Sequence, residues 1–217
     1  MANRSYLYSL SDEPTSYADR PETVGGLAEW AYDVPFSYRV LVSCGPRLCA
    51  SLISDGFEDD DPQDKTPLFG IIGEFDAGLA RLKKFGDAAR LVGSAALRDQ
   101  LDRTEEFLHG HRNRFVLLET VELDCMETSE ADALRERVER EIARCREVGA
   151  AIDALPDTAA AAAVELEKAA GPFRGLVFGD DFDNVRDRRT THPIGLGSWS
   201  EVLYFSLWNK AEFEAAN

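Results

Sequence analysis

The sequence predicts an α+β fold: a single domain over residues 1–217, with a mixed β-sheet of about five to six strands packed against about four helices. Two patterns carry this prediction. Short runs of alternating polar and large apolar residues, typical of strands, occur in both halves of the chain. Between them, apolar residues recur every three or four positions, the period of one helix face. The chain is also long enough to bury a sizeable core.

The N-terminal part is predicted to hold two strands separated by a long loop. Residues 4–9 alternate polar and large apolar side chains, which is typical of a strand. Residues 11–35 contain three prolines and a glycine pair, and we expect them to form an ordered loop. Residues 36–43 predict a second strand that ends at the Cys-Gly-Pro turn after it. Beyond this turn, residues 48–54 would form a strand or a short helix.

The middle of the chain changes to a helical period from Ile72 onward. The apolar residues that share one face of the first helix are Phe75, Leu79, Leu82 and Phe85. Ser94 can cap a second helix, and Gly110 suits its C-terminal end. Residues 115–123 return to strand character, and the apolar start of this run predicts a central position in the sheet.

The best-defined element is a long helix that begins after Ser129. Ser129 and Asp132 resemble a capping box. The apolar stripe of this helix consists of Leu134, Val138, Ile142, Cys145 and Ile152. Two oppositely charged pairs lie four residues apart on its outer face, Glu136–Arg140 and Arg137–Glu141. Because such pairs stabilise a helix by roughly 0.2–0.5 kcal/mol each, we interpret these arginines as partners on the helix surface and not as an anion site.

The last part of the chain is predicted to contain one more helix and two strands. An alanine-rich helix begins at Asp157 or Thr158 and stops before Gly171. Residues 173–178 and 199–208 then form two final strands joined by a polar loop. No internal repeat divides the sequence, so one domain is the simpler interpretation.

Charge is the feature of this sequence that says most about partners. The 217 residues carry 40 acidic and 24 basic side chains, a formal net charge of −16. Because nucleic acids and anionic membranes are bound by clustered Lys and Arg, this balance argues against both and favours a basic protein as partner. The predicted partner-binding segment is an acidic loop at about 55–66. Its acidic residues are Glu58, Asp59, Asp60, Asp61 and Asp64.

The sequence also bears on location and on metals. Its N-terminus lacks the apolar core of a signal peptide, and no apolar run approaches the roughly 20 residues of a membrane span, so we expect a cytoplasmic protein. The four cysteines are predicted to be reduced and mostly buried. Cys44 and Cys49 with His109 and His111 offer zinc-ligating atoms, but their spacing is loose. We expect core thiols and helix-capping histidines, with no metal and no cofactor.

An enzymatic alternative comes from an aspartate cluster after a predicted strand. Asp180, Asp181 and Asp183, with His192 downstream, could hold a divalent cation and supply acid–base groups for a metal-assisted hydrolase. An Asp-rich turn needs no catalytic role, however, and arginines follow it at once. Whether the protein is an enzyme is left open, with the balance against it. A third alternative is a small-ligand sensor that uses the C-terminal aromatic residues Trp199, Tyr204, Phe205 and Trp208.

Two short segments carry a resemblance. Residues 2–9 (Ala-Asn-Arg-Ser-Tyr-Leu-Tyr-Ser) resemble the start of an uncharacterised bacterial family, and residues 199–207 resemble its closing segment. This resemblance implies a domain without an assigned activity. As a small acidic α+β protein, the chain is also similar in character to bacterial immunity proteins, which neutralise secreted toxins. That likeness and the charge together predict a protein-interaction module that binds a basic partner.

Overall fold

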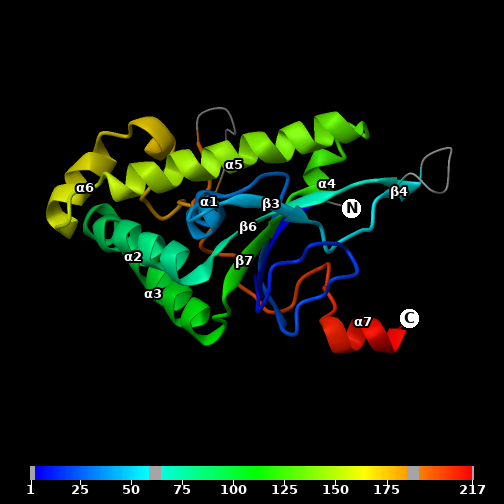
Figure 1. Ribbon diagram of the computed structural model, residues 1–217. Coiled ribbons are helices and arrows are strands. Elements are labelled where there is room, and N and C mark those ends of the chain that lie inside the picture. The colour runs from blue at the N-terminus through cyan, green and yellow to red at the C-terminus, as the bar shows by residue number, and fades with distance from the viewer. Residues whose placement is uncertain (1–2, 59–64, 185–190, 217) are drawn as a thin grey trace.

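The fold is built on a five-stranded antiparallel sheet with strand order β2-β1-β7-β6-β3 (Figure 1). This computed structural model describes residues 3–58, 65–184 and 191–216. The strands of the sheet are β1 (Arg4–Leu10), β2 (Val24–Ala31), β3 (Arg47–Ala50), β6 (Phe69–Glu74) and β7 (Phe115–Glu119). The central position predicted for the strand that begins at Phe115 is confirmed, since all five residues of β7 are buried.

The helices of the described residues are more numerous than the four or so expected from the sequence. They are α1 (Phe36–Val42), α2 (Phe75–Val92), α3 (Ala95–Gly110), α4 (Val121–Asp124), α5 (Ala131–Asp153), α6 (Ala159–Glu167) and α7 (Lys210–Ala216), with a 3₁₀ turn at Gly171–Phe173. The α+β class is confirmed. The additional helices α1, α4 and α7 have at most seven residues each, too few turns for a period to show.

The long helices agree with their sequence patterns. Ser94 caps α3 by accepting a hydrogen bond from the Leu97 N–H at 3.2 Å, and Thr158 caps α6 in the same way. The predicted apolar stripe of α5 is buried throughout. The capping box predicted at Ser129 is wrong, because the N-cap residue is Glu130 and no side chain caps that end. In the described segments, no helix is long and apolar enough to cross a bilayer.

One face of the sheet packs against helices. Leu7, Ile71, Val116 and Leu118 point to this face and join the larger hydrophobic core. Residues of α1, α2 and α5 complete that core, and Figure 1 shows these helices on one side of the strands. Alternate side chains of one strand point to opposite faces, so their neighbours along each strand face away from these helices.

The opposite face is covered by irregular chain. Tyr6, Tyr8, Ile72 and Leu117 form a second core with Leu203 and Leu207 from the C-terminal segment, here defined as residues 199–209. The Tyr8 hydroxyl donates to the Phe205 carbonyl at 2.7 Å, which fastens this segment over the sheet. The sheet is therefore buried on both faces, by helices on one side and by a non-helical segment on the other.

The strand predicted for residues 36–43 is wrong, because these residues form α1. Six of its seven residues are buried, and Arg39 is the exception. A helix that is apolar nearly all round shows no polar face, and so its period cannot be read from the sequence. The N–H groups of Phe36 and Ser37 donate to the carbonyls of Pro193 and Ile194, which satisfies the first turn from a distant segment.

The predicted loop at residues 24–31 and the two predicted final strands are also wrong. Residues 24–31, predicted as loop, form edge strand β2. Its Gly26 is not a turn residue: a Cβ there would lie 2.4 Å from the Glu201 carbonyl oxygen, so glycine allows the segment to approach. The final strands predicted at 173–178 and 199–208 are absent. Each stretch makes only one isolated bridge, because its apolar side chains point into a core while its backbone leaves the sheet.

The predicted strand 115–123 is also shorter than expected, since the chain turns into α4 after Glu119. The strand β6, which precedes α2, was not predicted as a strand. Its Gly70 and Gly73 weaken strand propensity, yet a Cβ on Gly73 would lie 2.5 Å from the Val42 carbonyl oxygen. The glycine is needed where β6 passes beneath α1.

The contact between α1 and α2 can be tested at Gly78. A Cβ at this position would lie 1.9 Å from the Leu41 carbonyl oxygen, so Gly78→Ala should lower the free energy of unfolding by roughly 1–3 kcal/mol or more. Gly110→Ala is the control, because nothing lies within 4 Å of a Cβ there. It should be neutral or stabilise by up to about 1 kcal/mol. Urea unfolding measures both, and equal effects would contradict the close packing.

Candidate functional site

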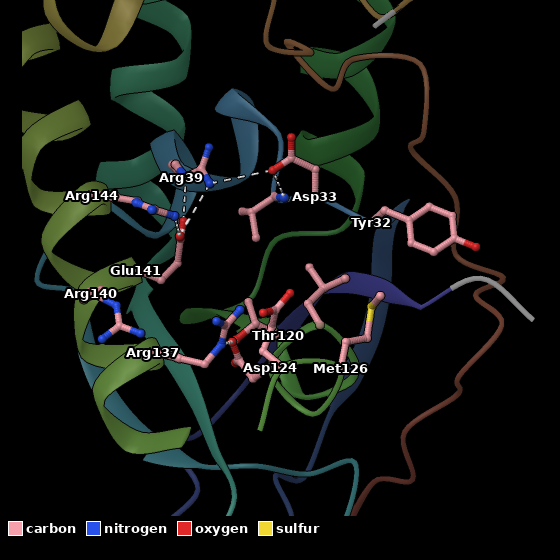
Figure 2. A pocket seen from close by; sticks show the side chains of 13 residues that line it. Tyr32, Asp33, Arg39, Thr120, Asp124, Met126, Arg137, Arg140, Glu141 and Arg144 are labelled. Carbon is pink, nitrogen blue, oxygen red and sulfur yellow. Dashed lines mark hydrogen bonds and ion pairs between the residues drawn. The ribbon is translucent and has the colours of Figure 1, made fainter. Parts of the chain in front are cut away.

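A cavity of about 240 Å³ lies between α5 and the end of β2, and its lining is rich in arginine (Figure 2). The loop at 32–34, helix α1 and the segment 120–127 form its other walls. Eight charged residues line it. The four basic ones are Arg39, Arg137, Arg140 and Arg144, and the four acidic ones are Asp33, Asp124, Glu127 and Glu141. The remaining lining residues are Tyr32, Val34, Thr120, Leu123 and Met126.

A buried ion pair joins two walls of this cavity. Arg39 of α1 donates from Nε to Glu141 Oε1 of α5 at 2.5 Å, and from Nη2 to Glu141 Oε2 at 3.4 Å. The two side chains are only 16% and 9% exposed. Burial opposes the charge of Arg39, but Glu141 and Asp33 outweigh it and raise the Arg39 pKa. This pair fixes α1 against α5, where the sequence had predicted a pair between Glu141 and Arg137.

A second buried carboxylate holds Arg137. Asp124, at the end of α4, accepts from Arg137 Nε at 3.0 Å and from the Thr120 hydroxyl at 2.6 Å. Burial raises the pKa of Asp124, while these two hydrogen bonds oppose the rise. Arg137 therefore lies across the floor of the cavity, as Figure 2 shows, and not along the outer surface of α5.

Arg140 and Arg144 are held much less firmly. Arg140 is 56% exposed and donates to Glu136 at 3.2 Å, the helical pair predicted from the sequence. Arg144 is 63% exposed and donates to Glu141 at 3.1 Å. The exposed Arg140–Glu136 pair contributes only about 0–1 kcal/mol, and the buried Glu141 carboxylate that Arg144 contacts is already paired with Arg39, so a ligand could replace both contacts.

The interpretation of the α5 arginines as surface partners holds for Arg140, which pairs with Glu136, but it did not anticipate the cavity that these arginines line. Arg137, Arg140 and Arg144 follow the spacing i, i+3, i+7, which places three guanidinium groups on one helix face. That spacing was the available signal. It gave no indication of Arg39 or Asp124, which come from other elements.

The aspartate cluster of the hydrolase alternative is divided by the structure. The Asp183 carboxylate accepts backbone N–H groups from Gly195, Leu196 and Gly197 at 2.5–2.8 Å. Burial raises the Asp183 pKa, and these three donors oppose the rise. The carboxylate thus holds the 195–197 loop in place, which is a structural use of the group.

The other members of that cluster lie at the surface. Asp180, Asp181 and His192 are exposed, and His192 takes part in the fold through its backbone N–H, which donates to the Gly175 carbonyl. Within the described ranges, no group of three or more His, Cys, Asp or Glu side chains is placed to hold a metal ion. The geometry brings none of these residues into a recognisable acid–base arrangement with Asp183.

The zinc candidates and the aromatic platform are likewise dispersed. All four cysteines are free thiols, with Cys49 and Cys145 buried. His111 caps α3 and bonds the Phe107 carbonyl at 2.6 Å and Glu201 at 2.7 Å. Of the C-terminal aromatics, Trp199 and Phe205 pack against the cores, while Tyr204 and Trp208 are exposed. These rings do not share one surface.

The acidic loop lies partly outside the described residues. Asp59, Asp60, Asp61 and Asp64 fall in the segment 59–64, of which nothing is described, and Glu58 lies on β4 (Phe57–Glu58). This short strand pairs with β5 (Lys65–Thr66) to form a two-stranded ribbon separate from the main sheet. Figure 1 shows β4 extending away from the sheet at the end of the molecule opposite α6.

A buried carboxylate that the sequence did not indicate lies beneath the second face of the sheet. Glu119 is fully buried at the end of β7 and accepts from the Leu52 N–H at 2.7 Å and the Ser51 hydroxyl at 3.0 Å. Burial raises its pKa to about 7, although both hydrogen bonds oppose the rise. Glu119 therefore titrates near neutral pH inside the protein.

The effect of Glu119 on stability should depend on pH. The unfolded carboxyl ionises near pH 4.5 and the folded one near pH 7, so the folded state binds more protons in this window. Its contribution to stability falls as pH rises from about 4.5 to 7, by roughly 3 kcal/mol. Glu119→Gln should remove this fall. The free energy of unfolding of the variant should therefore increase relative to that of the wild type as pH rises. Urea titrations at both ends of the window measure it, with Glu106→Gln as an exposed control, and parallel pH profiles would contradict it.

The structural role of Asp183 can be separated from a catalytic one. Asp183→Ala leaves three backbone donors without their acceptor and should cost about 2 kcal/mol or more in stability. Amide hydrogen exchange at residues 195–197 should become faster. Asp181→Ala changes an exposed side chain and should stay within about 0.5 kcal/mol of the wild type. Equal effects of the two substitutions would contradict the role given to Asp183.

Comparison with known proteins gives a family but no activity. No curated protein and no solved structure matches this chain. Residues 11–168 match a family described as a domain of unknown function, DUF7822. The match includes every lining residue of the arginine-rich cavity, but neither of the two terminal segments on which the resemblance to a bacterial family rested. Because the match spans more than half of the sequence, the chain belongs to the DUF7822 family.

Proposed function

We propose that this protein is an acidic protein-interaction module that docks a basic partner protein through the β4–β5 ribbon and the acidic residues of positions 58–64. The formal net charge of −16 supports this proposal, because such a field attracts and orients a basic partner. Five of the acidic residues lie within positions 58–64. The proposal takes the protein to be cytoplasmic. In its narrowest form, the basic partner is a toxin that the protein neutralises.

The base of the ribbon supports the proposal further, because it is a built structure. Gly56 has a φ of +117°, and a Cβ there would lie 2.3 Å from the Thr66 carbonyl oxygen. Glycine is therefore required where the two strands of the ribbon meet. Lys65 donates to Asp55 at 2.6 Å across the same base. The two strands that flank the acidic positions in the sequence thus form a defined structure, and none of their residues belongs to a hydrophobic core.

The hydrolase alternative has less support. Asp183 is occupied by three backbone donors, and the remaining candidates Asp180, Asp181 and His192 are exposed. Charge-driven docking needs only an accessible acidic surface.

The proposal predicts that binding depends on where the acidic residues lie, and not only on total charge. A variant with Glu58→Gln and Asn at positions 59, 60, 61 and 64 should lose a partner that the wild type retains from a lysate at low salt. The control variant neutralises five exposed acidic residues elsewhere: Asp99, Glu106, Asp132, Glu147 and Asp157. Both variants carry the same net charge.

The measurement is a pull-down at low and at high salt, with retained proteins identified by mass. The expected partner is basic, is retained by the wild type and the control variant, and is released by salt because screening weakens exposed charges. Equal loss with both variants, or retention by neither the wild type nor the control, would show that the ribbon is not a docking site.

A further inference from the structure

We propose that the arginine-rich cavity binds a small zwitterion of the free amino-acid type, with its carboxylate at Arg140 and Arg144 and its ammonium group at Asp33 and Glu127. The cavity is a different surface from the β4–β5 ribbon, and binding of this ligand does not depend on the docking proposal. Three features of the cavity support this ligand: the positions of its charged side chains, the ion pairs that some of them already form within the protein, and its volume.

The charges of the lining separate into those that hold the fold together and those that do not. Glu141 and Asp124 are buried and bind Arg39 and Arg137, so these four groups neutralise one another inside the protein. Two arginines and two carboxylates of the lining then remain. Arg140 and Arg144 are more than half exposed: Arg140 forms only a weak surface pair with Glu136, and the Glu141 carboxylate that Arg144 contacts is already bound to Arg39.

The two remaining carboxylates come from the opposite walls. Asp33, in the loop after β2, accepts the Val34 N–H at 2.7 Å and approaches Arg39 Nη2 only at 4.0 Å. Glu127, after α4, is exposed and forms no ion pair with a described residue. The available positive groups therefore lie on α5, and the available negative groups lie on the loops that face it. Figure 2 shows Arg140 and Arg144 on one side of the cavity and Asp33 on another.

This arrangement favours a ligand that carries both charges. Four guanidinium groups and four carboxylates give a lining without net charge, so a simple anion gains little from it inside a strongly acidic protein. A molecule with a carboxylate and an ammonium group can satisfy both walls together. An arginine fork matches a carboxylate in bidentate geometry, which adds orientation to attraction.

Size and lining narrow the ligand further. A cavity of about 240 Å³ is smaller than the roughly 300–1,000 Å³ of sites for drug-sized molecules, and it suits a single amino acid. Val34, Leu123 and Met126 provide apolar surface between the charged walls. At the rim, Tyr32 has a φ of +64°, a strained conformation for a residue other than glycine. An amino acid with an apolar side chain fits this combination.

The test uses L-leucine, L-methionine and L-phenylalanine as probes, with thermal shift and calorimetry on the full chain. At least one of them should bind and raise the melting temperature. The matching N-acetyl amino acid, which lacks the ammonium group, and the matching amide, which lacks the carboxylate, should each bind at least about tenfold more weakly. Inorganic phosphate should not compete.

Variants locate the site. Arg140→Gln with Arg144→Gln should weaken binding of the amino acid by about tenfold or more without loss of folding, since both side chains are exposed. Arg135→Gln is the matched control: Arg135 lies on α5, is 54% exposed and pairs with Glu139 four residues on, but does not line the cavity. Binding by none of the three amino acids, equal binding of the N-acetyl form or of phosphate, or equal weakening by both variants would overturn the proposal.

Discussion

The constraint on which the rest of this structure depends is that its sheet is apolar on both faces. Tyr8 on β1 and Leu117 on β7 face one way, while Leu7 and Val116 face the other, so neither side can be left in water. Helices cover one face. The C-terminal segment covers the other, with Leu203 and Leu207 in the second core. Because the family match ends at residue 168, this second cover comes from the part of the chain beyond it.

The same arrangement explains why charged groups are found inside the protein. The helices that cover the first face must also be held against one another, and the Arg39–Glu141 pair does this between α1 and α5. Removing an ion pair from water costs several kcal/mol per charge, which good hydrogen-bond geometry offsets only in part. The pair therefore specifies how the two helices meet more than it adds stability. It also fixes two walls of the arginine-rich cavity.

Charge acts differently at the two surfaces considered for function. The β4–β5 ribbon is separate from the main sheet, and five acidic residues lie at positions 58–64 of the sequence, a local excess that suits long-range attraction of a basic protein. The cavity has both signs in equal number, with its exposed arginines on α5 and its less buried carboxylates on the loops that face α5, which suits a small ligand that carries both charges. The net charge of the sequence therefore bears on the docking proposal. It says little about the ligand of the cavity, because the lining of the cavity has no net charge.

Patterns that depend on neighbouring residues were enough to identify α2, α3, α5 and α6 from the sequence. Their apolar residues repeat with the helical period over several turns, and Ser94 and Thr158 satisfy the first N–H groups of α3 and α6 locally. The pair Glu136–Arg140 was likewise predictable, since both residues lie on one helix. Charge and composition also indicated the acidic segment at 55–66.

Other features depend on residues that are distant in sequence, and only the tertiary structure decided them. Residues 36–42 form a helix in an environment that α2 and residues 193–194 provide. Gly26 belongs to a strand because it pairs with Tyr8 of β1, and it is a glycine because the Glu201 carbonyl approaches it closely. The cavity joins Arg39 to Glu141 across 102 positions of the chain. By itself, then, the sequence determined the elements whose signals are local in the chain, together with the net charge. The folded chain decided which buried groups meet, because burial is a property of neighbours in space.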